Sequence, residues 1–358
     1  MIDSPPPTGV LLINLGTPDA PHPAEVRRYL REFLWDPRVI TLNPVARWLL
    51  LHLVILPFRP RKSAAAYAAI WTPEGSPLLV NVERLARGVQ EELGASVPVE
   101  FAMRYGRPAV GPALERLRDR GARRLVCVPL YPQYAASSTE SSIEKVREET
   151  RRRRLDFEIE FIQDFYDHPS FIEPAAAAAR RVLEREAFDH VLFSFHGLPE
   201  SHIRALDATG AHCLERPDCC DRVEAVNRRC YRAQSYATAR ALLDALELEP
   251  DRTSVAFQSR LGRRPWIRPY TDAMIPELAA RGVRRLAVVV PSFTADCLET
   301  LEEIGIRGRE QFLESGGESL TLIPCVNDDP AWVRGLAAMV RERTDRARSE
   351  VFRETARR

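Results

Sequence analysis

The chain has 358 residues, of which 45% are hydrophobic and 28% charged, and its formal net charge is +1 at pH 7. This near-neutral balance gives no reason to expect nucleic acid as a partner, and the basic run Arg151–Arg154 is typical of a solvated helix face. The length allows one large hydrophobic core or two modest ones.

The N-terminus is polar and rich in proline, without the basic region and apolar run of a signal peptide. The longest apolar stretch, Trp48–Phe58, is interrupted by His52 and falls far short of the roughly 20 residues of a membrane-spanning helix. We therefore expect a cytoplasmic protein. In that reducing compartment its seven cysteines favour metal or redox chemistry over structural disulfides.

Eight short apolar runs, many with β-branched residues, follow one another along the chain. Each resembles a strand buried on both faces. In the fourth run, Glu158 and Glu160 alternate with apolar residues, which indicates an edge or half-exposed strand. The predicted strands are Val10–Asn14, Val99–Met103, Leu125–Leu130, Ile159–Ile162, Val191–Phe195, Ser254–Phe257, Leu286–Val290 and Leu320–Ile323.

Helix-like segments such as Asn81–Leu93 separate these strands, and the alternation predicts an α/β fold with parallel sheets. The strand spacing repeats after the fourth run. It predicts two similar Rossmann-like domains, 1–165 and 166–330, each a four-stranded parallel sheet flanked by helices. The segment 331–358 is expected to be helical and to pack back, on the N-terminal domain in the simplest arrangement.

Corresponding strands of the two predicted domains run into similar turns. The first strand of the first domain leads into Asn14–Pro18, and that of the second leads into Phe195–Pro199. Ligands of doubly wound sheets bind beyond the carboxyl ends of the strands. Two such domains facing each other would place these turns around one interdomain cleft.

His196 and Glu299 are the strongest candidates for chemistry at these strand ends. His196 follows an apolar strand and precedes a Gly-x-Pro turn, although its position alone fits a structural histidine equally well. Glu299 lies at helical spacing from Asp296, Glu302 and Glu303, where Asp296 and Glu299 also match a helix-capping pair. Facing His196, a carboxylate would instead suit a divalent cation or a proton relay.

Seven short motifs occur in the order in which ferrochelatases carry them, and no nucleotide-binding glycine loop follows any predicted strand. The motifs are Leu12–Pro18, Trp71–Pro77, Ala102–Tyr105, Tyr131–Tyr134, Ser194–Pro199, Phe257–Gly262 with Pro265-Trp266, and Asp296–Glu299. Each is weak alone, but together they make the chain resemble the ferrochelatase family from about residue 9 to residue 330. The resemblance implies chelatase domains that grip protoporphyrin IX and insert Fe²⁺ to form protohaem, the last step of haem biosynthesis.

The resemblance also assigns residues. His196 matches the family's essential histidine and Glu299 the acidic residue on the metal path, so both are candidates for catalysis and for contact with the substrate Fe²⁺. Which of them removes the two pyrrole protons and which delivers metal is left open. Where many members carry a histidine, this chain has Cys297, for which packing is the simpler role. The porphyrin-side candidates by motif match are Tyr67, Ser76, Arg104 and Trp266.

The stretch Trp48–Phe58 resembles the apolar lip of the ferrochelatase cleft. Such a lip could also dock as a peripheral contact on the inner membrane face, with Arg59, Arg61 and Lys62 facing porphyrin propionates or lipid headgroups. An ordinary buried helix is the alternative interpretation.

Four cysteines, Cys213, Cys219, Cys220 and Cys230, lie close together in the second domain. Their spacing matches no common zinc finger, yet so many thiols in a short stretch suit a [2Fe–2S] cluster or a zinc site. No cysteine follows Cys325, so the C-terminal arrangement of animal ferrochelatases is absent. Some bacterial members instead resemble this chain, which favours the iron–sulfur cluster over zinc and over unliganded thiols.

Three other functions stay open at this point. A chelatase for cobalt or nickel is disfavoured by the Trp71–Pro77 motif and by Trp266, and coproporphyrin III as substrate is disfavoured by the first motif. A haem-binding protein that has lost catalysis is disfavoured by the presence of both His196 and Glu299. The oligomeric state does not follow from the sequence.

Overall fold

The computed structural model describes residues 6–260, 262 and 264–355, with side chains described to residue 345. Two four-stranded parallel sheets form its framework, as predicted, and every predicted strand is present. The strand orders β2-β1-β3-β4 and β6-β5-β7-β8 give the two sheets the same topology. The strands are β1 (Thr8–Thr17), β2 (Val99–Gly106), β3 (Arg124–Pro129), β4 (Glu158–Phe161), β5 (His190–His196), β6 (Thr253–Gln258), β7 (Arg285–Val289) and β8 (Ser319–Leu322).

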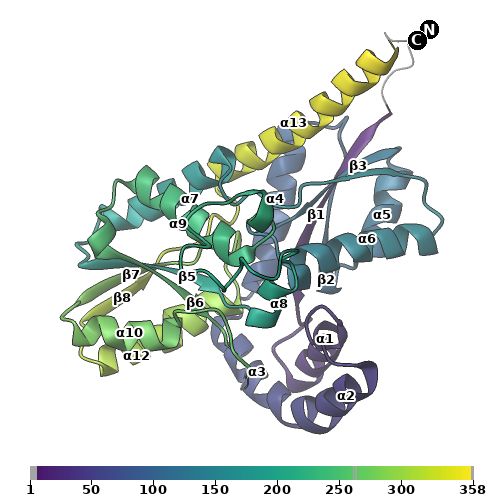
Figure 1. Ribbon diagram of the computed structural model, residues 1–358. Helices are drawn as coiled ribbons and strands as arrows, with labels where there is room; N and C mark the ends of the chain where they lie inside the picture. Colours follow the sequence, from purple (N-terminus) through teal and green to yellow (C-terminus); the bar gives the residue numbers. More distant parts are fainter. Residues whose placement is uncertain (1–5, 261, 263, 356–358) are drawn as a thin grey trace.

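Helices connect the strands and cover both faces of each sheet (Figure 1). The α-helices are α1 (Pro23–Trp35), α2 (Pro44–Leu49), α3 (Leu56–Ile70), α4 (Pro77–Leu93), α5 (Val110–Asp119), α6 (Ser141–Arg152), α7 (Pro169–Leu183), α8 (Glu200–Arg204), α9 (Tyr231–Leu246), α10 (Thr271–Ala280), α11 (Leu298–Leu301), α12 (Arg309–Glu314) and α13 (Pro330–Thr355). Short 3₁₀ or π turns are η1 (Leu50–Ile55), η2 (Ala136–Glu140), η3 (Ala225–Asn227), η4 (Pro250–Arg252) and η5 (Glu303–Gly308).

The central strands are apolar on both faces because helices cover both faces. In β1, Val10 and Leu12 join a core that continues into the second sheet, whereas Leu11 and Ile13 face a separate core beneath α5. The strand β4 lies at the edge of its sheet with Glu158 exposed, which confirms the edge assignment.

Helix α13 joins the two halves of the molecule. It contacts α4 on the first sheet and α7, which leads into the second. Close approach depends on glycine, because a Cβ on Gly335 would lie 2.3 Å from the carbonyl oxygen of Ser170. The fully buried Trp332 belongs to the core shared by both sheets. The helix therefore braces both halves, and a domain boundary near residue 165 stays a prediction.

The long first crossover forms a separate helical unit of residues 23–70, which we call the α1–α3 module (purple in Figure 1). Its own small core includes Tyr29 and Leu51. The other side of the predicted lip is exposed and apolar, with Leu53 60% and Phe58 76% accessible. The stretch is thus a helix with one buried face and one exposed apolar face. No helix among the described residues is both long and apolar enough to cross a bilayer.

Candidate active site

His196 is the last residue of β5, and its backbone lies between two neighbouring segments. On one side His196 pairs with Gln258 at the end of β6. On the other side β7 has already diverged, and the His196 backbone N–H donates instead to the Ser292 hydroxyl at 3.0 Å. The backbone of this half-buried histidine is therefore fixed from both flanks.

The hydrogen bonding of the His196 ring selects its tautomer. Nδ1 lies 2.6 Å from the carbonyl oxygen of Gly197. A carbonyl only accepts, so Nδ1 must carry the hydrogen and the neutral ring keeps its lone pair on Nε2. That nitrogen is the one able to take up a proton or bind a metal ion.

Gly197 allows the β6 side of the site to approach. A Cβ at Gly197 would lie 2.7 Å from the Gln258 carbonyl oxygen and 3.3 Å from the Trp266 ring. Pro199 also forms an isolated β-bridge with Trp266. Trp266, a predicted porphyrin-side residue, is thus placed against the turn that carries His196.

Glu299 stands at the start of α11. The Gln258 side chain donates to the Glu299 carbonyl at 2.7 Å, which joins the Glu299 backbone to the His196 strand pair. The alternative interpretation, in which Asp296 and Glu299 form a helix-capping pair, does not hold: the N-cap of α11 is Cys297, which forms a capping box with Thr300. Asp296 is drawn away because its carboxylate accepts from the Asn327 side chain at 2.7 Å and from the Cys325 backbone at 3.2 Å.

Glu303 belongs to the same site, although sequence reasoning treated it only as a helical neighbour. Its carboxylate accepts from the Ser259 backbone N–H at 2.8 Å and the Ser259 hydroxyl at 2.5 Å. Burial raises the pKa of Glu303. The Ser259 bond and the His196 charge oppose that rise, and the Glu299 charge adds to it. His196 and Glu299 therefore both lie within electrostatic reach of Glu303.

The α1–α3 module brings tyrosines to Glu299. Burial raises the pKa of Tyr67 well above its ordinary value, and the Glu299 charge adds to the rise. Burial and the Glu299 charge likewise raise the pKa of Tyr29. The Tyr29 hydroxyl donates to the Gly16 carbonyl at 3.1 Å, and its ring packs edge-on against the Tyr67 ring with centroids 6.5 Å apart. Glu299 also counteracts the burial that lowers the pKa of Arg59. Groups from both halves of the chain thus converge on one carboxylate.

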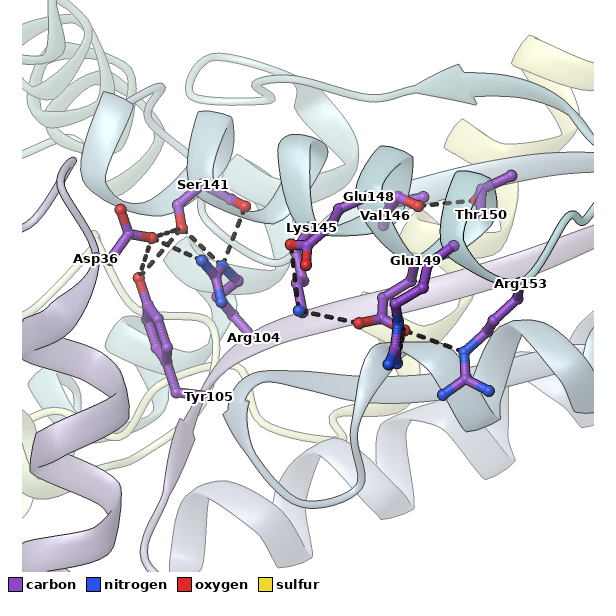
Figure 2. A network of polar contacts seen from close by, with 11 residues as sticks. Asp36, Arg104, Tyr105, Ser141, Lys145, Val146, Glu148, Glu149, Thr150 and Arg153 are labelled. Atoms are coloured by element: carbon purple, nitrogen blue, oxygen red, sulfur yellow. Dashed lines mark hydrogen bonds and ion pairs between the residues drawn. The ribbon is translucent and has the colours of Figure 1, made fainter.

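The side chains of Ser76 and Arg104 form hydrogen bonds with other side chains of the protein. Ser76 is buried and accepts from the Thr17 hydroxyl at 2.8 Å. Arg104 pairs with Asp36 at 2.6 Å and donates to the Ser141 hydroxyl at 2.7 Å (Figure 2).

Three buried hydroxyl groups lie near the start of α6, those of Tyr131, Thr139 and Ser142. None makes a hydrogen bond of normal geometry, although the Ser142 side chain lies close enough to Tyr131 to oppose the rise that burial causes in the Tyr131 pKa. Buried polar atoms are normally satisfied, so these hydroxyls are candidates to face water or substrate. Sequence reasoning noted Tyr131 only as part of a motif and missed the other two, because nothing in the pattern tells an unpaired hydroxyl from a paired one.

The four clustered cysteines are buried, and each contacts at least one of the others. The sulfurs of Cys219 and Cys220 are 3.7 Å apart, and Cys230 interacts with both Cys213 and Cys220. Two other groups donate to sulfur: the Leu214 N–H to Cys219 at 3.4 Å and the Arg232 guanidinium to Cys220 at 3.0 Å. Among the described residues, no group of three or more Cys, His, Asp or Glu is arranged to hold a metal ion.

Solved structures with a similar fold are chelatases. The sirohydrochlorin chelatase SirB from Bacillus subtilis subspecies spizizenii, in complex with cobalt, aligns with a TM-score of 0.51 at 13% identity, covering 94% of each chain. SirB from Bacillus subtilis with Fe³⁺ gives 0.50 at 15% identity, again over 94% of each chain. At such low identity these likenesses establish the fold alone.

Sequence relatives carry the more specific information. A ferrochelatase of Ectopseudomonas mendocina (strain ymp) is 49% identical over 92% of this chain and 96% of the relative. One from Azotobacter vinelandii is 49% identical over 93% of this chain and 98% of the relative. The ferrochelatase family model matches residues 7–344. With nearly half of the residues identical across almost the whole chain, the chain belongs to the ferrochelatase family.

Proposed function

We propose that Fe²⁺ enters protoporphyrin IX between the α1–α3 module and the edge of the second sheet that carries His196, Glu299 and Glu303. The chain's activity is that of its family, insertion of Fe²⁺ to form protohaem in haem biosynthesis. The observation that carries the proposed location is the contact between α3 of the module and α11, together with the His196 imidazole, whose Nδ1–H donates to Gly197 and which lies within electrostatic reach of Glu303.

His196 is the base in this proposal. Metal insertion displaces two pyrrole protons. The Nε2 lone pair of a neutral imidazole can accept one of them and must pass it on before it accepts the second. The carboxylates of Glu299 and Glu303 supply oxygen donors for Fe²⁺ on its way to the macrocycle. The raised pKa of Glu303 equips that residue to hold a proton as well.

Aromatic side chains form the proposed walls for the macrocycle. Tyr67 from the module and Trp266 beside His196 supply flat apolar surface. Ser76 and Arg104 are proposed to shape the inner end, through the contacts they already make with Thr17 and Asp36.

The test is anaerobic addition of Fe²⁺ and protoporphyrin IX to the purified chain, following loss of the free-porphyrin absorption bands. Wild type is expected to turn over, and a His196→Ala variant that retains its fold is expected to lose turnover. Competition with Co²⁺ and Ni²⁺ in the same assay separates an iron enzyme from a chelatase with another metal preference.

We also propose that Cys213, Cys219, Cys220 and Cys230 hold a [2Fe–2S] cluster, with zinc as the alternative. Four buried thiols in pairwise contact, two of which accept hydrogen bonds from nitrogen donors, fit the donor set of an iron–sulfur group. Such a group would cross-link this irregular segment. Metal and sulfide analysis of the aerobically purified protein, with its visible spectrum, tests this: colourless protein containing zinc would contradict it.

The exposed apolar side chains of the module support a peripheral contact with a membrane at the inner face. Trp48, Leu53 and Phe58 are all at least 47% accessible and lie on one helical stretch. The wild-type protein is expected to co-sediment with anionic vesicles, and the Phe58→Ser variant is expected to co-sediment less. Leu313→Ser, which alters an exposed leucine on α12, is the matched control and should leave it unchanged.

A further inference from the structure

Asp36 joins three segments that are far apart in the sequence. It caps the C-terminus of α1, whereas Arg104 and Tyr105 come from β2, and Ser141 begins α6. One carboxylate oxygen accepts from Arg104 at 2.6 Å, from Tyr105 at 2.9 Å and from Ser141 at 2.5 Å (Figure 2). The other accepts from the Arg38 backbone at 2.7 Å.

This junction is shielded from water. The Asp36 side chain is 3% exposed and that of Arg104 14%. Burial acts to raise the pKa of Asp36. Hydrogen bonds from Ser141, Arg38 and Tyr105, together with the Arg104 charge, outweigh it and leave the pKa below its ordinary value. A buried carboxylate with four donors is a satisfied, rigid contact, and removing it would leave those donors unpaired.

The junction fixes the α1–α3 module to the end of β2. Phe33 on α1 packs against the Tyr105 ring with centroids 5.0 Å apart, directly beside the polar contacts. The same helix carries Tyr29, and α3, which packs on α1, carries Tyr67. Helix α3 contacts α11, the helix that contains Glu299, and the Glu299 charge acts on the pKa of both tyrosines. The orientation of the module at Asp36 therefore decides where its porphyrin-facing side chains lie.

Arg104 is occupied by this junction. Its Nε donates to the Ser141 backbone carbonyl and hydroxyl, its Nη2 donates to Asp36, and its guanidinium lies 4.3 Å from the Tyr105 ring centroid. Because its guanidinium is bonded to Asp36 and Ser141, Arg104 would affect substrate binding by holding α1, β2 and α6 together.

We propose that Asp36 and Arg104 are positioning residues that hold the α1–α3 module against the catalytic edge of the second sheet and thereby set the affinity for porphyrin. This inference rests on the proposed seat of the porphyrin between the module and that edge. It assigns Arg104 to an anchor for the module in place of a direct contact with a porphyrin carboxylate.

The experiment compares the full-length Asp36→Asn chain with wild type. Protoporphyrin IX affinity is measured by fluorescence quenching without iron, and kcat and KM by anaerobic Fe²⁺ insertion. The dissociation constant and KM for porphyrin are expected to rise about tenfold, with kcat at saturation within about twofold of wild type, the pattern of lost uniform binding. Hydrogen exchange should show faster exchange of backbone amides in α1 and α3.

Glu149 offers a matched control. It is also a buried carboxylate in this half, and it binds Lys145, Arg152 and Arg153, but all these partners lie on or next to α6 (Figure 2). Glu149→Gln should lower the melting temperature and leave porphyrin affinity and module exchange unchanged. If Asp36→Asn behaves like Glu149→Gln, the proposal is overturned.

A double-mutant cycle tests the pair itself. Arg104→Gln should reproduce the affinity loss of Asp36→Asn, and the double variant should be no weaker than either single one. Additive losses would overturn the pairing. Ser141→Ala removes only one of the hydrogen bonds to Asp36 and should weaken porphyrin binding to a smaller extent. This variant replaces Asp36→Asn in the test if Asp36→Asn does not fold.

Tyr67→Ala separates failure of this inference from failure of the proposed porphyrin seat. If Tyr67→Ala weakens porphyrin binding and Asp36→Asn does not, the anchoring role fails and the seat stands. If neither variant weakens binding, the proposed seat fails as well.

Discussion

Replacing Gly197 by alanine perturbs the catalytic turn by one methyl group. The new Cβ would lie 2.7 Å from the Gln258 carbonyl oxygen, closer than real Cβ atoms approach, and 3.3 Å from the Trp266 ring. Because the nearer atom is backbone at the end of β6, the strand or the turn has to move. Overpacking of this kind costs about 1–3 kcal/mol of stability.

The displacement acts on His196, whose ring is bonded to the Gly197 carbonyl. A shift of a few tenths of an ångström to one ångström at a reacting group lowers turnover by about 10- to 100-fold. We therefore expect Gly197→Ala to reduce kcat for Fe²⁺ insertion by that amount, beyond any loss of folded protein.

Gly9→Ala is the control. A Cβ there would also be crowded, with contacts of 3.0 to 3.3 Å, but the neighbours are side chains of Ala122, Leu117 and Leu125 at the start of β1 in the first sheet. Urea unfolding should show comparable destabilisation in both variants, and insertion kinetics a loss of kcat only for Gly197→Ala. Equal kcat values for the two folded variants would show that the Gly197 turn does not control the position of His196.

Three further predictions concern single groups. Ser292→Ala removes the acceptor of the His196 backbone N–H and should lower kcat several-fold with the KM for porphyrin unchanged. Ser292→Thr keeps a hydroxyl acceptor and should have a kcat close to that of wild type in the same steady-state assay. Ion pairs lower the pKa of Glu149 from 4.5 to about 2. The stability that its carboxylate adds is therefore present above pH 4.5 and lost as the pH falls towards 2. The difference in urea unfolding between wild type and Glu149→Gln should vanish over that range. Burial raises the pKa of Glu303, so its ionised form opposes folding at neutral pH. Glu303→Gln should therefore unfold at higher urea than wild type at pH 7, lose that gain as the pH falls through the raised pKa towards 4.5, and insert iron more slowly.

Much of the fold follows from local pattern. The apolar runs around Val10 and Val191 predict the central strands because they are buried on both faces, and the repeated spacing predicts two equivalent sheets. His196 could be found because a strand end and a Gly-x-Pro turn mark it. Glu299 could be found because its motif follows another strand end.

The rest depends on contacts between distant segments. Asp36 meets partners 68 to 105 residues away, and nothing in its local sequence distinguishes it from a turn residue. Local sequence could not decide whether Asp296 caps α11 for the same reason, since its carboxylate accepts hydrogen bonds from Asn327 and Cys325 on another loop. Glu303 was visible as a helical neighbour, but only the Ser259 contact places its carboxylate near His196.

The central claim is that His196, with its Nε2 lone pair available, is the base for metal insertion between the two halves. Anaerobic insertion of Fe²⁺ into protoporphyrin IX by His196→Ala, at matched folded concentration and with porphyrin binding measured in parallel, tests it most directly. If His196 is the base, the variant retains porphyrin binding and loses turnover by at least about 100-fold. Turnover close to wild type would contradict it.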